Sequence, residues 1–128
     1  MTDETGEGGA NVEHKLLVVL LTGKSDLFRA RQALVFAKNA KRVGILQDVR
    51  FLFFGPGVEL LDPEDPDTGE IRELVEELHQ RGTAVSACVS NLRHFDLMDE
   101  VRKQNVFVEE ASVLISELVK DGYQVMTF

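Results

Sequence analysis

The sequence predicts an α/β fold, in which a three-layer α/β/α sandwich surrounds a mostly parallel sheet of about five strands. Short apolar runs of the length of buried strands alternate along the chain with segments of helical periodicity. Each strand–helix–strand step implies a right-handed crossover, which leaves neighbouring strands parallel. The chain has 128 residues, 44% of them hydrophobic, which suffices for one domain with its own core. The order of the strands is not fixed by these patterns.

The first strand is expected over residues 15–22, because the run KLLVVLLT fits a strand that is buried on both faces. Ser25 or Asp26 can cap the following helix, which is expected to run to about Arg42. Small and apolar residues recur through this helix at helical spacing: Leu27, Ala30, Ala33, Leu34, Ala37 and Ala40.

The rest of the chain continues the alternation. Further strands are expected over residues 49–55, 83–89, 106–108 and 123–128, and further helices over 70–80, 96–103 and 111–120. Gly82 is expected to end the helix over 70–80.

Acidic residues concentrate in two segments outside the predicted elements. Residues 1–14 hold four of them and residues 62–70 hold five, and neither segment contains Lys or Arg. Outside these segments 13 acidic residues stand against 14 basic ones, although the formal net charge of the chain is -8. We therefore expect a disordered acidic tail at residues 1–14 and a single domain at residues 15–128. No clustered basic face is visible, so nucleic acid is not an expected partner.

The sequence favours a cytoplasmic protein without a membrane partner. Its single cysteine, Cys88, excludes an intramolecular disulfide and fits a reducing compartment. The N-terminal residues lack the basic start and the apolar run of a signal peptide. The longest apolar run, residues 16–21, is too short to cross a bilayer. The three histidines are widely scattered, so we expect neither a metal site nor a bound cofactor.

Candidate functional residues follow the predicted strands, because ligands in such sheets bind beyond the carboxyl ends of the strands. Gly23, Gly55 and Gly57 lie in two of these loops, where glycine allows close approach of the backbone. Asp26 is a candidate to face Cys88 across the strand ends, although helix capping explains it as well.

Cys88 lies where the strand over 83–89 gives way to a polar turn. If a short helix begins at Ser90 or Asn91, its amides and positive end face the sulfur, and Arg93 and His94 follow closely. Such surroundings lower the pKa of a thiol and create a nucleophile. The residues alone leave a second interpretation equally open, that of an inert cysteine on the apolar face of the strand.

Three motifs occur in order along the chain: FFGPGVEL at 53–60, CVSNLRH at 88–94 and GYQVMTF at 122–128. They resemble, in turn, the strand with its GDGV-type loop, the CVSAALRR-type segment and the C-terminal strand of the DsrE/TusD sulfur-relay family. The likeness extends over about residues 15–128.

The resemblance implies a DsrEFH-like fold, a homo-oligomer such as a trimer or hexamer, and a cysteine that accepts sulfur as a persulfide. Only Cys88 corresponds to that cysteine, with Val89, Ser90 and Arg93 matching the motif beside it. The expected function is therefore that of a small sulfur carrier or sulfurtransferase-type protein that passes sulfur to a partner thiol. The alternative is a non-catalytic, oligomeric module of the same fold that binds a small ligand or a partner.

Overall fold

Five parallel strands form one sheet in the order β5-β4-β3-β2-β6 in the computed structural model, which describes residues 12–128. The strands are β2 (Lys15–Leu20), β3 (Asp48–Phe53), β4 (Val85–Cys88), β5 (Phe107–Glu109) and β6 (Tyr123–Thr127). Every strand pair is parallel, which confirms the predicted α/β class with a parallel five-stranded sheet. The predicted acidic tail over residues 1–14 falls mainly on residues 1–11, which lie outside the described residues.

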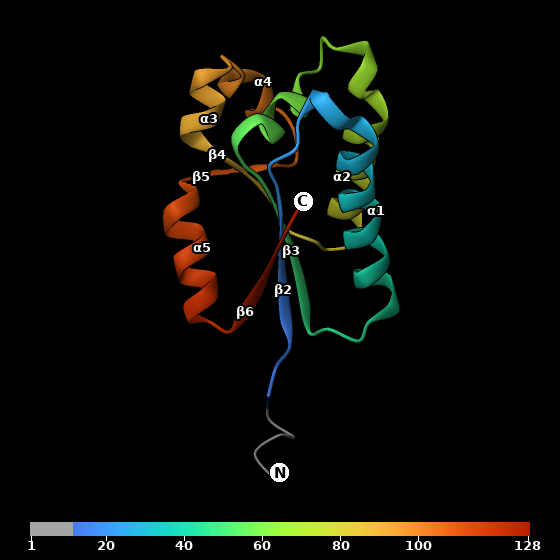
Figure 1. The fold of residues 1–128 in the computed structure, drawn as a ribbon, viewed down its shortest axis with the longest axis vertical. Helices are drawn as coiled ribbons and strands as arrows, with labels where there is room; N and C mark the ends of the chain where they lie inside the picture. Colours follow the sequence, from blue (N-terminus) through green and yellow to red (C-terminus); the bar gives the residue numbers. More distant parts are fainter. Residues whose placement is uncertain (1–11) are drawn as a thin grey trace.

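Helices cover both faces of this sheet (Figure 1). They are α1 (Leu27–Val43), α2 (Gly69–Gln80), α3 (Val89–His94), α4 (Met98–Arg102) and α5 (Ala111–Lys120). Short 3-10 segments occur at η2 (Lys24–Asp26), η3 (Gly55–Leu61) and η4 (Pro66–Thr68). Among residues 12–128, no helix has the length and apolar character needed to span a membrane.

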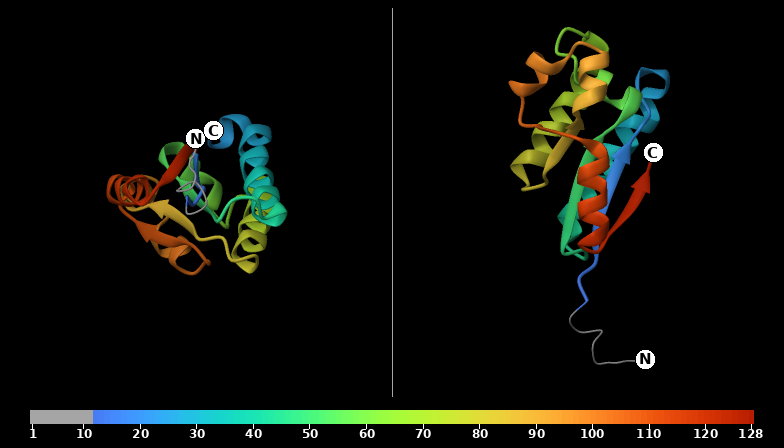
Figure 2. Two further views of the ribbon diagram at one scale, coloured as in Figure 1. Left: turned by 90° about the horizontal axis from the view of Figure 1, so that it is seen from below. Right: turned by 90° about the vertical axis from the view of Figure 1, so that its left-hand side faces the viewer.

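The connections between strands explain why α5 lies across the sheet from α1 and α2. The chain runs from β2 through β3 and β4 to β5 in one direction across the sheet, and β6 then returns to the far edge beside β2. Because crossovers are right-handed, this reversal places the last helix on the opposite face. Figures 1 and 2 show α5 on one side of the sheet and α1 with α2 on the other.

Local sequence signals set the ends of α1 as predicted. The Asp26 carboxylate accepts a hydrogen bond from the Arg29 backbone N–H at 3.0 Å and so caps the helix. Gly44 ends it in the left-handed conformation, with φ of 70°.

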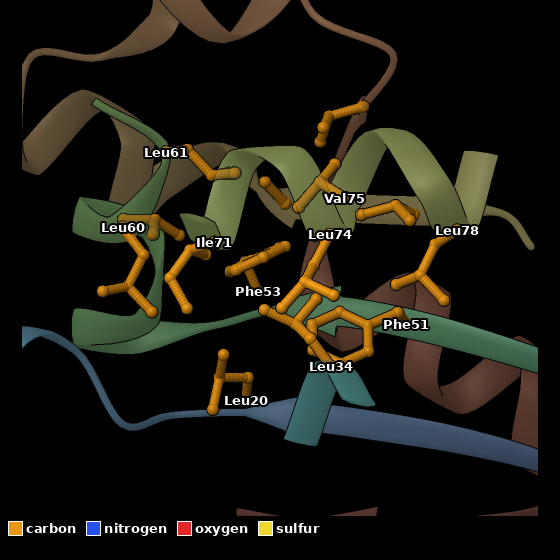
Figure 3. Packing of buried hydrophobic residues seen from close by; sticks show 14 of the residues in the cluster. Leu20, Leu34, Phe51, Phe53, Leu60, Leu61, Ile71, Leu74, Val75 and Leu78 are labelled. Atoms are coloured by element: carbon orange, nitrogen blue, oxygen red, sulfur yellow. The ribbon is translucent and has the colours of Figure 1, made fainter. Parts of the chain in front are cut away.

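The core divides into two layers, one on each side of the sheet. The larger layer lies between the sheet and α1 with α2, and includes Phe51 and Phe53 of β3 (Figure 3). The smaller layer lies under α5 and includes Leu17 and Leu52 together with Cys88. The candidate cysteine is therefore part of the core that α5 covers.

After β4 the structure differs from the prediction in where the strand ends and in the length of the second helix. The expected strand over 83–89 ends at Cys88, and α3 follows immediately, whereas the helix expected over 96–103 is only the five residues of α4. Leu92 and Val101 anchor these short helices to the larger core layer. Asp96 between them has a positive φ of 55°, which separates the two helices.

Candidate functional site

Cys88 is the last residue of β4 and lies at a point where the connections of the sheet diverge. The chain leaves β4 into α3, whose Leu92 packs on the side of α1 and α2, and leaves β5 into α5 on the other side. In α/β sheets such a divergence opens a crevice at the carboxyl ends of the strands, where ligands bind. The topology therefore makes Cys88 a candidate site residue.

Hydrogen-bond donors from two helices converge on the sulfur. The Cys88 Sγ lies 3.2 Å from the Ser90 Oγ. Burial acts to raise the pKa of the Cys88 thiol, but the Ser90 hydroxyl and the backbone amides of Asn91, Ala111 and Ser90 oppose it. These donors prevail and hold the pKa of Cys88 below its ordinary value. Ala111 is the first residue of α5, so the positive end of that helix also faces the sulfur.

The other side of Cys88 is apolar. The residue is only 2% exposed and packs with Ala111 and Leu114 of α5. Ser90, by contrast, is exposed, and its hydroxyl contacts the sulfur directly. The sulfur thus lies just beneath the surface, with Ser90 between it and solvent.

Asn91 ties the cysteine segment to the loop after β3. Its Oδ1 accepts a hydrogen bond from the Gly55 backbone N–H at 2.8 Å, while its own backbone amide acts on the Cys88 sulfur. Gly55 has a φ of 54°, a conformation that favours glycine. The contact links the loop after β3 to the helix that follows Cys88.

The structure gives the other predicted glycines and Asp26 packing and capping contacts. A Cβ on Gly57 would lie 2.2 Å from the Leu20 carbonyl oxygen, and one on Gly23 would lie 2.5 Å from the Pro56 carbonyl oxygen. These two glycines therefore allow the loops after β2 and β3 to pack closely on each other. Asp26 caps α1.

Val89, Arg93 and His94 follow Cys88 within α3, but the two basic side chains are exposed. The His94 ring packs edge-on against Phe95, with ring centroids 4.9 Å apart. The strongest influences that lower the pKa of Cys88 are neutral hydroxyl and amide donors. The sequence led us to expect amides of a following helix together with the cations Arg93 and His94, and only the amides act on the sulfur.

Sequence reasoning missed Ala111 and Glu109. Glu109 pairs with Cys88 in the register of β4 and β5, and its Oε2 accepts a hydrogen bond from the Ser86 Oγ at 2.6 Å. Both residues come to the site through strand pairing across about 20 residues of chain, and no local motif indicates that pairing. The one signal in the sequence for a helix start near the end of this sheet was the predicted strand at 106–108, which a predicted helix follows at once.

The site has the chemical features of a thiolate centre. The donors around Cys88 stabilise negative charge on sulfur, which is the nucleophilic form of a thiol. Among residues 12–128, no group of three or more His, Cys, Asp or Glu side chains is arranged to hold a metal ion.

Comparisons with solved structures show the same fold at low sequence identity. A conserved protein of unknown function from Bacteroides thetaiotaomicron, BT1422, aligns with a TM-score of 0.73 and 18% identity over 89% of this chain and 94% of its own. The ychN protein of E. coli aligns with a TM-score of 0.61 and 19% identity over 91% of this chain and 100% of its own. A protein of unknown function from Methanobacterium thermoautotrophicum, MTH1491, gives a TM-score of 0.57 and 17% identity over 91% and 100% of the two chains.

No curated protein matches the sequence. The sequence model of the DsrE/DsrF-like family matches residues 14–128, nearly the whole chain. The chain therefore belongs to the DsrE/DsrF-like family.

Proposed function

We propose that the protein is a sulfur carrier in which Cys88 holds a transferable sulfur atom as a persulfide. The observation that carries the proposal is the convergence of the Ser90 hydroxyl and three backbone amides on the Cys88 sulfur. An inert core cysteine needs no such donors, whereas a sulfur that carries negative charge during its reaction is stabilised by them.

The proposed cycle consists of two exchanges at sulfur. The Cys88 thiolate attacks the outer sulfur of a sulfane donor, a new S–S bond forms, and the donor leaves as a thiolate or, from thiosulfate, as sulfite. The thiolate of a partner protein then attacks the outer sulfur of the Cys88 persulfide, and Cys88 leaves as a thiolate. Each step follows the chemistry of thiol–disulfide exchange and needs no outside oxidant or reductant.

In the persulfide the charge lies on the outer sulfur, so the donors around the Cys88 Sγ stabilise chiefly the thiolate that begins the first exchange and leaves in the second. Because Ser90 is exposed and contacts the Cys88 sulfur, the outer sulfur has its shortest route to solvent past that side chain. Helix α3 has six residues and is the first element after the cysteine.

Intact mass measurement tests the proposal. After incubation of the native protein with thiosulfate or with glutathione persulfide, the mass should rise by that of one sulfur atom, and dithiothreitol should remove the gain. The Cys88→Ser variant should gain nothing. A native protein that gains no sulfur, although the same protein gains one in urea, would contradict the proposal.

A second candidate function is favoured by the burial of Cys88, which is only 2% exposed. In this alternative the family fold serves as a non-catalytic module that binds a small ligand or a partner, and the cysteine packs beneath α5. The rate of alkylation by iodoacetamide separates the two functions. Modification in minutes without denaturant supports the carrier, and modification only after unfolding supports the module.

A further inference from the structure

Strand β6 forms an unprotected edge of the sheet. It pairs with β2 on one side and with no strand on the other among residues 12–128. The sequence YQVMT contains no charged residue and no proline, and Gln124, Val125, Met126 and Thr127 are exposed. Edge strands normally carry Lys, Pro, a bulge or a covering segment that prevents pairing with another chain. The opposite edge, β5, has only three residues and ends in Glu109.

The hydrogen bonds already made by β6 fix which of its backbone groups point outward. The Phe128 N–H donates to the Val19 carbonyl at 2.9 Å, and the Phe128 carbonyl accepts from the Leu21 N–H at 2.9 Å. Because backbone groups alternate in direction along a strand, the N–H and C=O groups of Tyr123, Val125 and Thr127 point away from the sheet.

An uncharged surface of α1 continues this edge. Phe28, Phe36 and Val43 are exposed along one side of the helix, at 72%, 36% and 53%, and Ile45 follows at 77%. Phe36 contacts Phe128 at the end of β6, with ring centroids 5.9 Å apart, so the helix surface and the strand edge adjoin. An apolar groove of about 350 Å³ lies here, lined by Phe36, Asn39, Ala40, Val43, Ile45 and Leu46.

We propose that β6 pairs antiparallel with β6 of a second copy of this chain, about a twofold axis through Val125. In this register Tyr123 faces Thr127 and Val125 faces Val125, so all the outward backbone groups of both strands find partners. No other register of this strand satisfies all three residues. No like charges meet, because the strand has no charge, and a twofold axis requires such a self-complementary surface.

Apolar side chains beside β6 supply much of the contact area that this pairing needs. The exposed side chains of Val125, Met126 and the four apolar residues of α1 and its C-terminal turn present roughly 500 Å² per copy, estimated from their exposed fractions and sizes. Backbone and polar atoms of β6 add to this surface, against roughly 800 Å² per partner in a standard interface. The pairing would join two sheets into one and cover the edge.

Light scattering coupled to size exclusion tests the interface. The particle mass of Val125→Lys should be half that of the wild type at the same concentration, because two lysines would face each other at the axis. The matched control is Phe107→Lys on the other edge, where the side chain is 62% exposed, and it should leave the mass unchanged. A monomeric wild type, or an assembly whose mass Val125→Lys does not change, overturns the proposal.

Cross-linking tests the register in a Cys88→Ser background, which removes the native thiol. Facing residues of a hydrogen-bonded antiparallel pair have Cα atoms about 5.5 Å apart, within the range of about 4.4–6.8 Å that a disulfide spans. Val125→Cys should therefore form a covalent dimer under mild oxidation. Val113→Cys on α5, where the side chain is 49% exposed, should remain uncross-linked. Equal cross-linking at both positions would refute the register.

Discussion

Replacement of Ser90 by alanine tests how the protein stabilises a charged sulfur. The Ser90 Oγ lies 3.2 Å from the Cys88 Sγ and is the only side-chain donor to it among the described residues. Because Ser90 is exposed, its replacement removes little packing and should leave the fold intact. The expected result is a higher pKa of the Cys88 thiol and less thiolate at neutral pH.

The size of the effect follows from the strength of this hydrogen bond. A bond to a charged group contributes about 1.5–3 kcal/mol. Water can partly replace the hydroxyl at an exposed position, so about 1.4 kcal/mol is a reasonable loss, equal to a tenfold change in the ratio of thiolate to thiol. The three backbone amides remain in the variant and continue to lower the pKa of the Cys88 thiol.

The assay is the pH dependence of iodoacetamide alkylation, measured on wild type and Ser90→Ala. Below the inflection the variant should react about tenfold more slowly, whereas well above it both proteins are thiolates and the rates should converge. Slower reaction by the same factor at every pH would indicate altered access and refute the electrostatic role. Ser112→Ala, at an exposed position of α5, is the control and should match the wild type.

Two further predictions concern stability. Burial and the hydrogen bond to Asp48 raise the pKa of Tyr123 to about 12, above the value of about 10 for an unfolded tyrosine. The contribution of neutral Tyr123 to the free energy of unfolding is therefore complete below about pH 10 and is lost as the pH rises through about 12. Thermal melts should therefore show a smaller loss of Tm between these pH values in Tyr123→Phe, and an equal loss would contradict the assignment. Gly57→Ala should lower the free energy of unfolding by about 2 kcal/mol or more in urea titrations, since its Cβ would meet the Leu20 carbonyl oxygen at 2.2 Å. Gly69→Ala, with no atom within 4 Å of the new Cβ, should be neutral or stabilising, and similar losses in both variants would exclude the steric explanation.

The elements that the sequence predicted well are those set by local signals. The apolar runs of β2 and β3, the Asp26 cap of α1 and the helix over residues 111–120 all follow from nearby residues. Sheet order depends on packing between segments far apart, so the return of β6 to the edge beside β2 was not accessible. The helix expected over residues 96–103 was too long, because α4 is held by Val101 in the core and not by helical periodicity.

The candidate site divides in the same way. The position of Cys88 at a strand end and the helix directly after it could be predicted from the motif. The influence of Ala111 could not, because it results from the pairing of β4 with β5. The expected cationic neighbours, Arg93 and His94, proved to be exposed, since the first turn of α3 brings amides and not side-chain charges to the sulfur.

The burial of Cys88 and the lowering of its pKa have a common origin in the topology. A sulfur at the end of β4 is covered by α5 because that helix returns across this face of the sheet, and burial alone would favour the neutral thiol. The position of α5 also directs its first amide, that of Ala111, at the sulfur, and α3 adds the amides of Ser90 and Asn91. Fixed donors that lower the pKa raise the fraction of the sulfur present as thiolate at neutral pH, which is the form that reacts, provided that a sulfane donor can reach it. The sulfur transfer that we propose would therefore depend on access to Cys88 beside the exposed Ser90, and the alkylation rate of Cys88 separates a carrier from a non-catalytic module.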